Sequence, residues 1–205
     1  MPRPAVCSEK ARPIPSAAKA RQMLIEGNQN FMRDWKDDHV IDRNIRDARV
    51  ASQDPYAVIV CCSDSRVTPE FIFGAGLSDL FVIRIAGNVA AEEAIASVEY
   101  AVGVLGVKLV VVLGHEGCGA VKEAMKRTEL TYHVSRLLSH MLPVLSKVQV
   151  REAENSSVVA KTVKANAKLA AEALATASPK IIGKRGVEVV PAYYHLGSGK
   201  VEYLD

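Results

Sequence analysis

The sequence predicts an α/β protein with a central, mostly parallel β-sheet, an antiparallel edge strand, flanking helices and an N-terminal helical arm. Three short, almost entirely apolar runs indicate strands covered on both faces, at 56–62, 80–85 and 109–113. Between the second and the third run, residues 92–105 place apolar side chains at helical spacing, with acidic residues in the first turn. A strand, a helix and a strand in this order imply a parallel, right-handed crossover.

Further helices are predicted on either side of these strands. The apolar residues of 16–35 recur at spacings of three, four and seven, which favours an amphipathic helix or two, broken near Gly27 and Asn28. Three later helical patterns are present, at 119–125, 132–148 and 158–175. Within the second of them, Pro143 implies a kink or break.

The last segment, 187–204, reads as two strands around Gly197, Ser198 and Gly199. A tight turn there returns the last strand antiparallel to the one before it, which supplies the antiparallel edge of the sheet. No internal repeat or low-complexity block divides the chain. We therefore expect a flexible N-terminal arm over 1–15 and a single α/β domain over 16–205.

Composition excludes several classes of protein. The 205 residues include 26 Lys and Arg against 23 Asp and Glu, and the formal charge of +3 excludes a dedicated polybasic binder of nucleic acid or membrane surfaces. The longest apolar stretch, 101–114, is too short to cross a bilayer of about 30 Å as a helix. Residues 1–15 contain no visible targeting signal. We expect a cytoplasmic protein that binds neither nucleic acid nor membrane.

Four cysteines are present, Cys7, Cys61, Cys62 and Cys118. Because two of them are adjacent, the four are poorly placed to form a disulfide framework, and a reduced compartment with thiolates free to bind metal fits better. Side chains alternate along a strand, so Cys61 points away from Cys62 and is expected in the core. Cys7 lies in the expected arm.

Two polar motifs follow predicted strands at their carboxyl ends, where open α/β sheets bind ligands. They are CSDSR at 62–66 and GHEGCG at 114–119. Cys62, His115 and Cys118 form a Cys₂His set, which suits zinc because thiolate and imidazole are among its preferred ligands. Three protein ligands leave one coordination position open, as catalytic zinc sites do.

Simpler interpretations of each motif are also open. A buried cysteine is most often just a small apolar residue, and a lone His-x-x-Cys need not bind metal. A phosphatase-like cysteine loop is disfavoured, because Cys61 and Cys62 both lie too close to Arg66 for the usual spacing of that loop. The metal interpretation gains weight because both motifs end successive strands of one sheet, and because Asp64 and Arg66 follow the first cysteine.

With these two motifs the sequence resembles the β-class carbonic anhydrases. The family's Cys-x-Asp-x-Arg motif is CSDSR at 62–66, and its His-x-x-Cys motif is HEGC at 115–118. FVIRIAGNV at 81–89 and SVEYAV at 97–102 match as well. The resemblance covers most of the chain from about Ala17 onward, and the paired motifs are specific.

The resemblance implies a zinc enzyme. Cys62, His115 and Cys118 would hold one zinc ion per subunit, and zinc-bound hydroxide would attack carbon dioxide to give bicarbonate and a proton, reversibly. The chain would be a carbonate dehydratase with carbon dioxide and bicarbonate as its small-molecule partners. It would form a homodimer or a homotetramer built as a dimer of dimers.

The resemblance also implies that Asp64 and Arg66 form a carboxylate–guanidinium dyad. Two thiolates cancel the formal charge of Zn²⁺, so this metal is a weaker Lewis acid than one held by three imidazoles. Asp64, oriented by a bidentate Arg66, can accept a hydrogen bond from the zinc-bound hydroxide and help to aim it. If that pairing were lost, Asp64 could bind the metal as a conditional fourth ligand and close the site.

Some family members stabilise the closed state with bicarbonate held by a Trp, an Arg and a Tyr. Arg84 matches the Arg and Tyr194 is a candidate for the Tyr, but Ile59 stands at the Trp position, three residues before Cys62. Because this trio is incomplete, we expect an open resting site with Asp64 off the metal.

Substrate-binding residues follow from the plant-type members of the family. Gln53, Phe81 and Tyr100 match positions that line a small apolar pocket; the Gln53 amide could bind bicarbonate, and Phe81 offers a dry wall. Because family sites are shared across a dimer interface, these three are expected to come from the neighbouring subunit. Gly119 would let a backbone N–H approach a substrate oxygen. The alternatives are an exposed loop Gln, an ordinary strand Phe and a core helix Tyr.

Two other functions stay open on the sequence. One is hydrolysis of carbonyl sulfide or carbon disulfide on the same scaffold, which the pocket and its access route would decide. The other is a noncatalytic, zinc-binding regulatory homologue, against which the intact Asp64, Arg66 and Gln53 argue. No spacing selects a proton shuttle among the scattered histidines, His39, His133, His140 and His195.

Overall fold

Five strands form one sheet in the order β2-β1-β3-β4-β5. The computed structural model describes residues 13–34, 42–146, 149–179, 182–183 and 186–204. The strands are β1 (Ala57–Cys61), β2 (Leu80–Arg84), β3 (Leu109–His115), β4 (Glu188–Tyr194) and β5 (Val201–Tyr203). β1 pairs in parallel with β2 and β3, β3 pairs in parallel with β4, and β5 runs antiparallel to β4. The predicted sheet, with its antiparallel edge strand, is confirmed.

The side chains of β1 and β3 alternate between two hydrophobic clusters, one on each face of the sheet. Val58 and Val110 belong to one cluster, whereas Ile59 and Val111 belong to the other, and all four are fully buried. Successive side chains of a strand point to opposite faces, so a strand covered on both faces is apolar at every position. This is why the sequence shows apolar runs here and not an alternating pattern.

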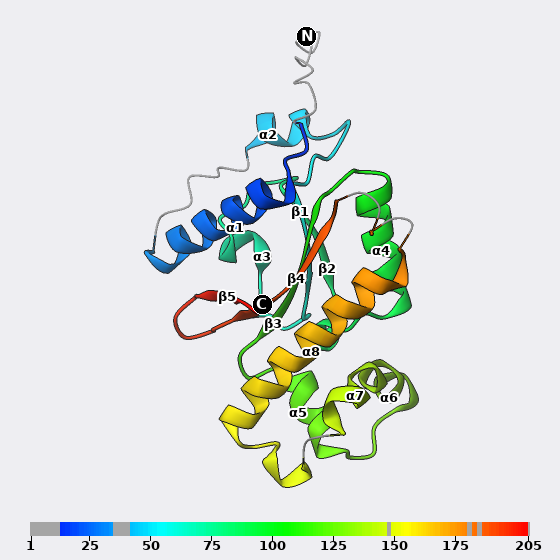
Figure 1. Cartoon of the computed structure of the whole chain (residues 1–205). Helices are drawn as coiled ribbons and strands as arrows, with labels where there is room; N and C mark the ends of the chain where they lie inside the picture. Colours follow the sequence, from blue (N-terminus) through cyan, green and yellow to red (C-terminus); the bar gives the residue numbers. More distant parts are fainter. Residues whose placement is uncertain (1–12, 35–41, 147–148, 180–181, 184–185, 205) are drawn as a thin grey trace.

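One face of the sheet is covered by α4 (Glu92–Gly103) and α8 (Ser156–Ala177), with α5 (Gly119–Lys126) beside them. α8 packs along β3 and β4, and α4 packs on β1 and β2. The Asn155 side chain caps α8 by accepting hydrogen bonds from the N–H groups of Ser157 and Val158. In Figure 1 the yellow-to-orange α8 runs diagonally across the molecule.

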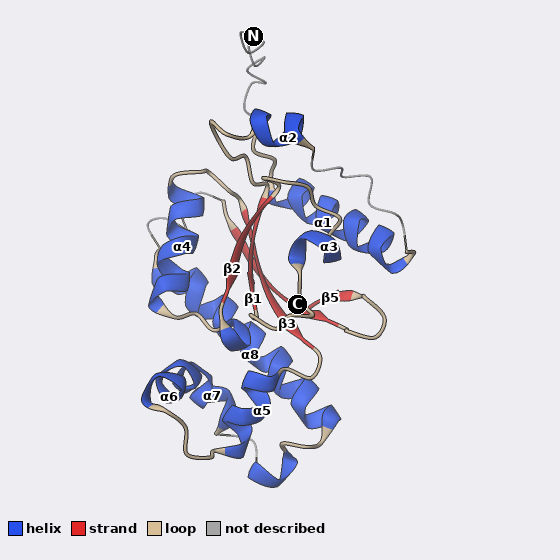
Figure 2. Ribbon diagram, turned by 180° about the vertical axis from the view of Figure 1, so that it is seen from behind, coloured by secondary structure: helices blue, strands red, loops and turns tan. Residues whose placement is uncertain are grey.

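The opposite face is covered by α1 (Ala17–Met32) and the short α3 (Pro69–Ile72). Figures 1 and 2 both show α1 and α3 on the side of the sheet away from α4. The Ser16 side chain caps α1 by accepting a hydrogen bond from the Lys19 N–H. The six-residue α2 (Arg43–Ala48) buries none of its residues.

α1 is one unbroken helix, so the predicted break near Gly27 and Asn28 is wrong. A Cβ on Gly27 would lie 1.8 Å from the Phe73 carbonyl oxygen, so glycine is what lets α1 approach this backbone. The buried Asn28 side chain donates hydrogen bonds to the carbonyl oxygens of Ile72 and Gly199. Tertiary contacts therefore place both residues in a helix that their propensities disfavour.

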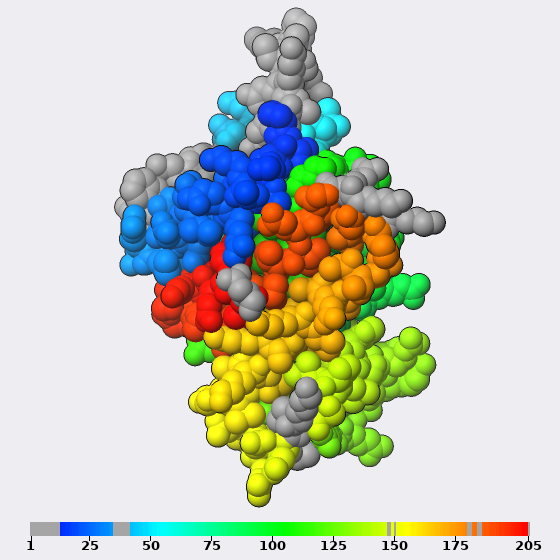
Figure 3. All heavy atoms as spheres, viewed as in Figure 1, coloured from blue at the N-terminus to red at the C-terminus, as the bar shows by residue number. Residues whose placement is uncertain are grey.

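The segment between α5 and α8 folds into short helices at one end of the molecule, coloured green to yellow in Figure 3. Pro143 lies in the first turn of α7, so the break that it predicts in this region is confirmed. The elements are α6 (Tyr132–Leu138), α7 (Leu142–Leu145) and the 3-10 helices η2 (Ser139–Met141) and η3 (Val150–Glu152). A further 3-10 helix, η1 (Ala86–Asn88), connects β2 to α4.

None of the helices in the described ranges is long and apolar enough to cross a membrane. Of the expected N-terminal arm, residues 1–12, with Cys7, lie outside the described residues. Residues 13–16 precede α1 and belong to no helix or strand.

Candidate metal centre

Three elements bring Cys62, His115 and Cys118 together. Cys62 directly follows β1, His115 ends β3, and Cys118 is the N-cap residue of α5. β1 and β3 pair in parallel, so their carboxyl ends lie at the same edge of the sheet. Parallel pairing of β1 and β3 is therefore enough to bring Cys62 close to His115.

The three side chains have the geometry of a small-ion site. Their candidate ligand atoms all lie within 4.8 Å of one another, and the two sulfur atoms are 4.0 Å apart. Tetrahedral zinc with Zn–S bonds of about 2.3 Å separates two sulfurs by about 3.8 Å. All three residues are at most 5% exposed. His115 Nε2 is buried and has no hydrogen-bond partner among the described residues, which fits a ligand atom of a metal.

The other ring nitrogen of His115 sets its orientation. Nδ1 lies 3.0 Å from the carbonyl oxygen of Glu116. A carbonyl oxygen only accepts hydrogen bonds, so Nδ1 carries the ring proton and donates a hydrogen bond to this oxygen. Nε2 is then left with a free lone pair. A carbonyl acceptor on the far nitrogen is the usual partner of a metal-binding histidine. The described residues thus fit zinc in donor type, spacing and tautomer.

Hydrogen bonding also prepares one thiol for ligation. The pKa of Cys62 is lowered to about 4, chiefly because the Cys118 thiol donates to its sulfur; burial opposes this effect, while His115 and the Gly87 N–H support it. The pKa of Cys118, the donor in that bond, is raised. Cys62 therefore loses its proton more readily than Cys118, and the thiolate is the form that ligates metal.

Cys61 behaves differently from its neighbour. It is fully buried in the cluster on the α1 face of the sheet, as expected from strand alternation. Burial raises the pKa of its thiol to about 12. Cys61 is therefore a protonated core residue.

Asp64 and Arg66 form a two-pronged ion pair beside the cluster. Arg66 Nε donates to Asp64 Oδ1 at 2.9 Å, and Arg66 Nη2 donates to Oδ2 at 2.7 Å. This bonding holds the pKa of Asp64 well below its usual range, so the carboxylate is ionised at neutral pH. Asp64 Oδ2 also lies 3.8 Å from His115 Nε2. The carboxylate thus adjoins the candidate ligand His115 while it is paired with Arg66.

Arg84 and Gly87 hold the loop that carries Cys62, and sequence reasoning did not find this role. Arg84 donates to the main-chain oxygens of Asp64 and Cys62, at 2.8 and 3.4 Å. The Gly87 N–H donates to the Cys62 sulfur at 3.3 Å. Both residues belong to the FVIRIAGNV segment, and Arg84 also matches the Arg of the bicarbonate-holding trio, but neither signal points to a role in holding this loop.

Three of the four expected substrate residues, Gln53, Phe81 and Tyr100, lie away from the cluster within this chain. Gln53 is exposed in the segment before β1, and Phe81 pairs with Val58, four residues before Cys62. At about 3.3 Å per residue, Phe81 lies about 13 Å from the level of Cys62 along the strand. Tyr100 is 47% exposed, and its ring centroid is 6.2 Å from that of Phe81. The structure brings Phe81 and Tyr100 together, but not to the cluster of their own chain.

The remaining expected residues are placed as follows. Gly119 is the first residue of α5, next to Cys118, and is exposed. Ile59 and Tyr194 are buried in the cluster on the α1 face, the face away from Cys62. Arg84, the third member of the incomplete trio, is bound to the carbonyl oxygens of the Cys62 loop.

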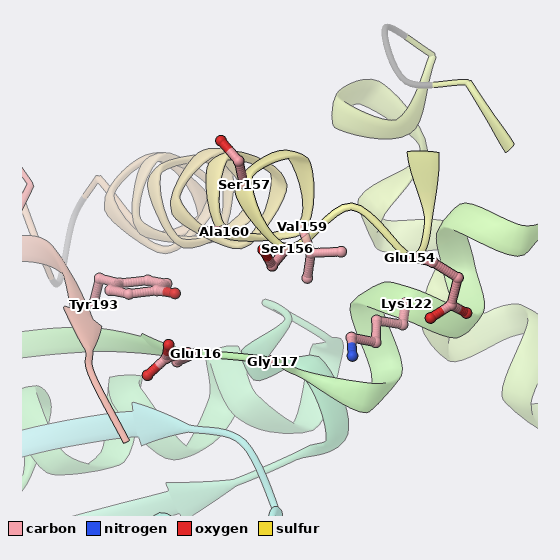
Figure 4. Close-up of a pocket in the computed structure, with 9 residues that line it drawn as sticks. All are labelled: Glu116, Gly117, Lys122, Glu154, Ser156, Ser157, Val159, Ala160 and Tyr193. Carbon is pink, nitrogen blue, oxygen red and sulfur yellow. The ribbon is translucent and has the colours of Figure 1, made fainter. Parts of the chain in front are cut away.

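A cavity of about 350 Å³ lies between the start of α8 and the segment Glu116–Gly117 (Figure 4). Lys122 and Tyr193 also line it, and the Tyr193 hydroxyl points into the space. None of the three candidate ligands contributes to its lining. The cavity therefore adjoins the loop between His115 and Cys118 and is separate from the metal cluster.

Known proteins are similar to this chain in sequence and in fold. The family model described as carbonic anhydrase matches residues 57–201. Carbonic anhydrase 2 of Mycobacterium tuberculosis is 45% identical over 115 residues, which span 55% of each chain, so the match covers about half of that relative. The carbonic anhydrase of Mycolicibacterium smegmatis is 33% identical over 204 residues, spanning 93% of this chain and 94% of the relative.

A solved structure agrees with these matches. A tetrameric β-carbonic anhydrase from Sordaria macrospora superposes with a TM-score of 0.66 at 26% identity, over 75% of this chain and 82% of its own. The match to the family model extends from β1 into β5 and contains all three candidate ligands. The chain therefore belongs to the carbonic anhydrase family, in its β class.

Proposed function

We propose that this protein is a zinc-dependent carbonic anhydrase that interconverts carbon dioxide with bicarbonate and a proton. The observation that carries the proposal is the buried set Cys62, His115 and Cys118 with the ionised Asp64 beside it. Two thiols and an imidazole suit zinc, and three protein ligands leave a fourth position for chemistry. A structural zinc site would be closed by a fourth protein ligand.

Zinc, when bound, supplies the Lewis acidity that makes water a nucleophile at neutral pH. The protein's own groups have three tasks. The thiolates and the Nε2 of His115 hold the ion. The ionised Asp64 accepts a hydrogen bond from the attacking water and thereby aims it. Arg66 keeps that carboxylate oriented through its two hydrogen bonds.

We propose that the resting site is open, with Asp64 paired to Arg66 and not to the metal. Its two bonds from Arg66, at 2.9 and 2.7 Å, support this assignment. Moving Asp64 onto the metal would break both of these charge-assisted bonds. The Ile59 side chain offers no hydrogen bond that would stabilise the alternative.

We further propose that the active unit is a homo-oligomer, either a dimer or a dimer of dimers. Gln53, Phe81, Tyr100 and Gly119 are proposed to bind substrate, the first three from the neighbouring subunit. Gln53, Phe81 and Tyr100 lie away from the cluster of their own chain, which supports this sharing. The tetrameric assembly of the Sordaria macrospora protein supports it as well. We also propose a flexible N-terminal arm over 1–15 followed by a single α/β domain over 16–205. We propose a cytoplasmic location for the protein.

Stopped-flow hydration of carbon dioxide, with metal analysis of the same sample, tests the proposal. We expect about one zinc ion per chain, activity that is lost on chelation and activity that returns on adding zinc. Carbonyl sulfide and carbon disulfide are assayed in parallel. Zinc-loaded protein that hydrates no carbon dioxide would overturn the proposal, and turnover of either sulfur compound alone would reassign the substrate.

A further inference from the structure

We propose that Asn166 is a positioning residue for the metal centre and that it acts on the Cys62 thiolate through Gly87. This inference rests on the proposed metal centre and deepens it. Asn166 lies on α8, 79 residues from Gly87 in the sequence and outside both cysteine motifs.

Two hydrogen bonds connect the three residues in series. The Asn166 side-chain amide donates to the carbonyl oxygen of Gly87 at 2.8 Å. The N–H of the same glycine donates to the Cys62 sulfur at 3.3 Å. Asn166 is 1% exposed, and Gly87 is also buried. Bonds in such a water-excluded environment are electrostatically stronger than surface bonds.

Gly87 needs an external restraint to keep its amide aimed at sulfur. Its φ of +74° is in the left-handed region, and a Cβ there would lie 2.1 Å from Met141 Cε. Glycine meets these demands, but it is also the residue with the most backbone freedom. The Asn166 amide anchors the peptide group that follows Gly87. This anchor limits rotation about the backbone bonds of Gly87 and so helps to keep its N–H directed at the Cys62 sulfur.

An N–H aimed at a thiolate changes how that sulfur binds metal. The bond stabilises negative charge on sulfur and holds the side chain in place before the ion arrives. Groups that orient metal ligands typically change metal affinity by about 10- to 100-fold when they are replaced. Without the bond, the Cys62 thiolate is more electron-rich and less well oriented.

Asn166→Leu tests the inference, because leucine has similar volume but cannot donate to Gly87. Thr162→Val is the matched control: Thr162 is 4% exposed on the same helix, and its hydroxyl donates to Val158 within that helix. We expect zinc competition titrations to show about 10- to 100-fold weaker binding for Asn166→Leu and unchanged binding for the control. With cobalt(II) in place of zinc, the thiolate-to-cobalt absorption band should move to longer wavelength only in Asn166→Leu.

A measurement on the wild-type chain tests the bond from the Gly87 N–H to the Cys62 sulfur without any variant. With cadmium-113 in the site and nitrogen-15 in the protein, the Gly87 amide proton should show scalar coupling to cadmium through the Cys62 sulfur. Asn166→Ala, which removes the donor without adding an ionisable group, replaces Asn166→Leu if leucine prevents folding, as judged by circular dichroism.

The outcomes separate this inference from the proposed function. Wild-type protein that binds neither zinc nor cadmium would overturn both. Normal metal binding without the Gly87 coupling, or with equal zinc affinity and an equal cobalt spectrum in the folded Asn166 variant, would overturn the positioning role alone.

Discussion

The side-chain oxygen of Asn28 accepts a hydrogen bond from the Val201 N–H at 2.9 Å, although 173 residues separate the two in sequence. The same side chain donates to the carbonyl oxygens of Ile72 and Gly199, at 3.1 and 2.8 Å. One buried amide thus ties α1 both to the end of α3 and to the β4–β5 hairpin. This connection determines where the N-terminal helix lies on the sheet.

Asn28→Leu should lower the free energy of unfolding by at least about 3 kcal/mol. The change leaves one N–H and two carbonyl oxygens without their partner, and each buried unpaired group costs about 1–3 kcal/mol. Urea unfolding followed by circular dichroism measures the loss. Gln29→Leu changes the adjacent, exposed residue and should have little effect. Equal stability of the two variants would contradict the tethering role of Asn28.

Gly27→Ala should destabilise the protein, although alanine is the better helix former by about 1 kcal/mol. The added Cβ would lie 1.8 Å from the Phe73 carbonyl oxygen, so α1 must shift away from that backbone. Thermal unfolding of the variant decides between the two effects. A higher melting temperature would mean that helix propensity, and not the close contact, dominates at this position.

Cys118→Ser and Cys61→Ala should separate the two roles of cysteine. Serine at 118 removes a proposed ligand, so bound zinc and activity should be lost together. Cys61 is fully buried on the other face of the sheet, so its loss should reduce stability while zinc is retained. Metal content and unfolding midpoints of both variants are the readouts. Full zinc retention by Cys118→Ser would refute the proposed ligand set.

Asp64→Asn should keep zinc bound and lower kcat/KM by about 10²-fold, the lower limit for losing a positioned proton-accepting group. Asparagine keeps the size of the side chain but not the charge that pairs with Arg66. Asp47→Asn is the control, because Asp47 also faces an arginine, in an exposed pair with an N–O distance of 3.6 Å. The stopped-flow rate should fall only for Asp64→Asn, while both variants keep the metal content of the wild type. Equal rates for the two variants would contradict the aiming role.

Tyr203→Phe should move alkaline unfolding to higher pH. Burial raises the pKa of Tyr203 from 10.0 to about 12, against the lowering effect of Arg21. Because the pKa of Tyr203 is higher in the folded state, deprotonation of Tyr203 favours the unfolded chain. The folded state is therefore unaffected below pH 10 and loses stability as the pH rises towards 12. The buried hydroxyl has no hydrogen-bond partner among the described residues, so phenylalanine should cost little at neutral pH.

The control for that experiment is Tyr132→Phe, since Tyr132 is 67% exposed. Its midpoint of alkaline unfolding should equal that of the wild type. An unchanged midpoint for Tyr203→Phe as well would show that Tyr203 does not limit stability at high pH.

Much of the fold was predictable because its signals are local. The apolar runs that become β1 and β3 reflect strands buried on both faces, and Pro143 marks a helix boundary through its own geometry. The failure at Gly27 and Asn28 has the opposite cause. Propensity predicts a break at both residues, but the contacts of both are made with Phe73 and with other backbone groups distant in sequence.

The sequence by itself determined the sheet, its two apolar faces and the three candidate ligands, because strand periodicity and parallel pairing convert spacing into position. Only the tertiary structure placed Asn28 against the hairpin and Asn166 against Gly87. It also placed Phe81 and Tyr100 away from the cluster of their own chain. The physical reason is that a hydrogen bond or a packing contact between distant segments depends on how whole elements dock. Docking leaves no periodic signal in the residues that it joins.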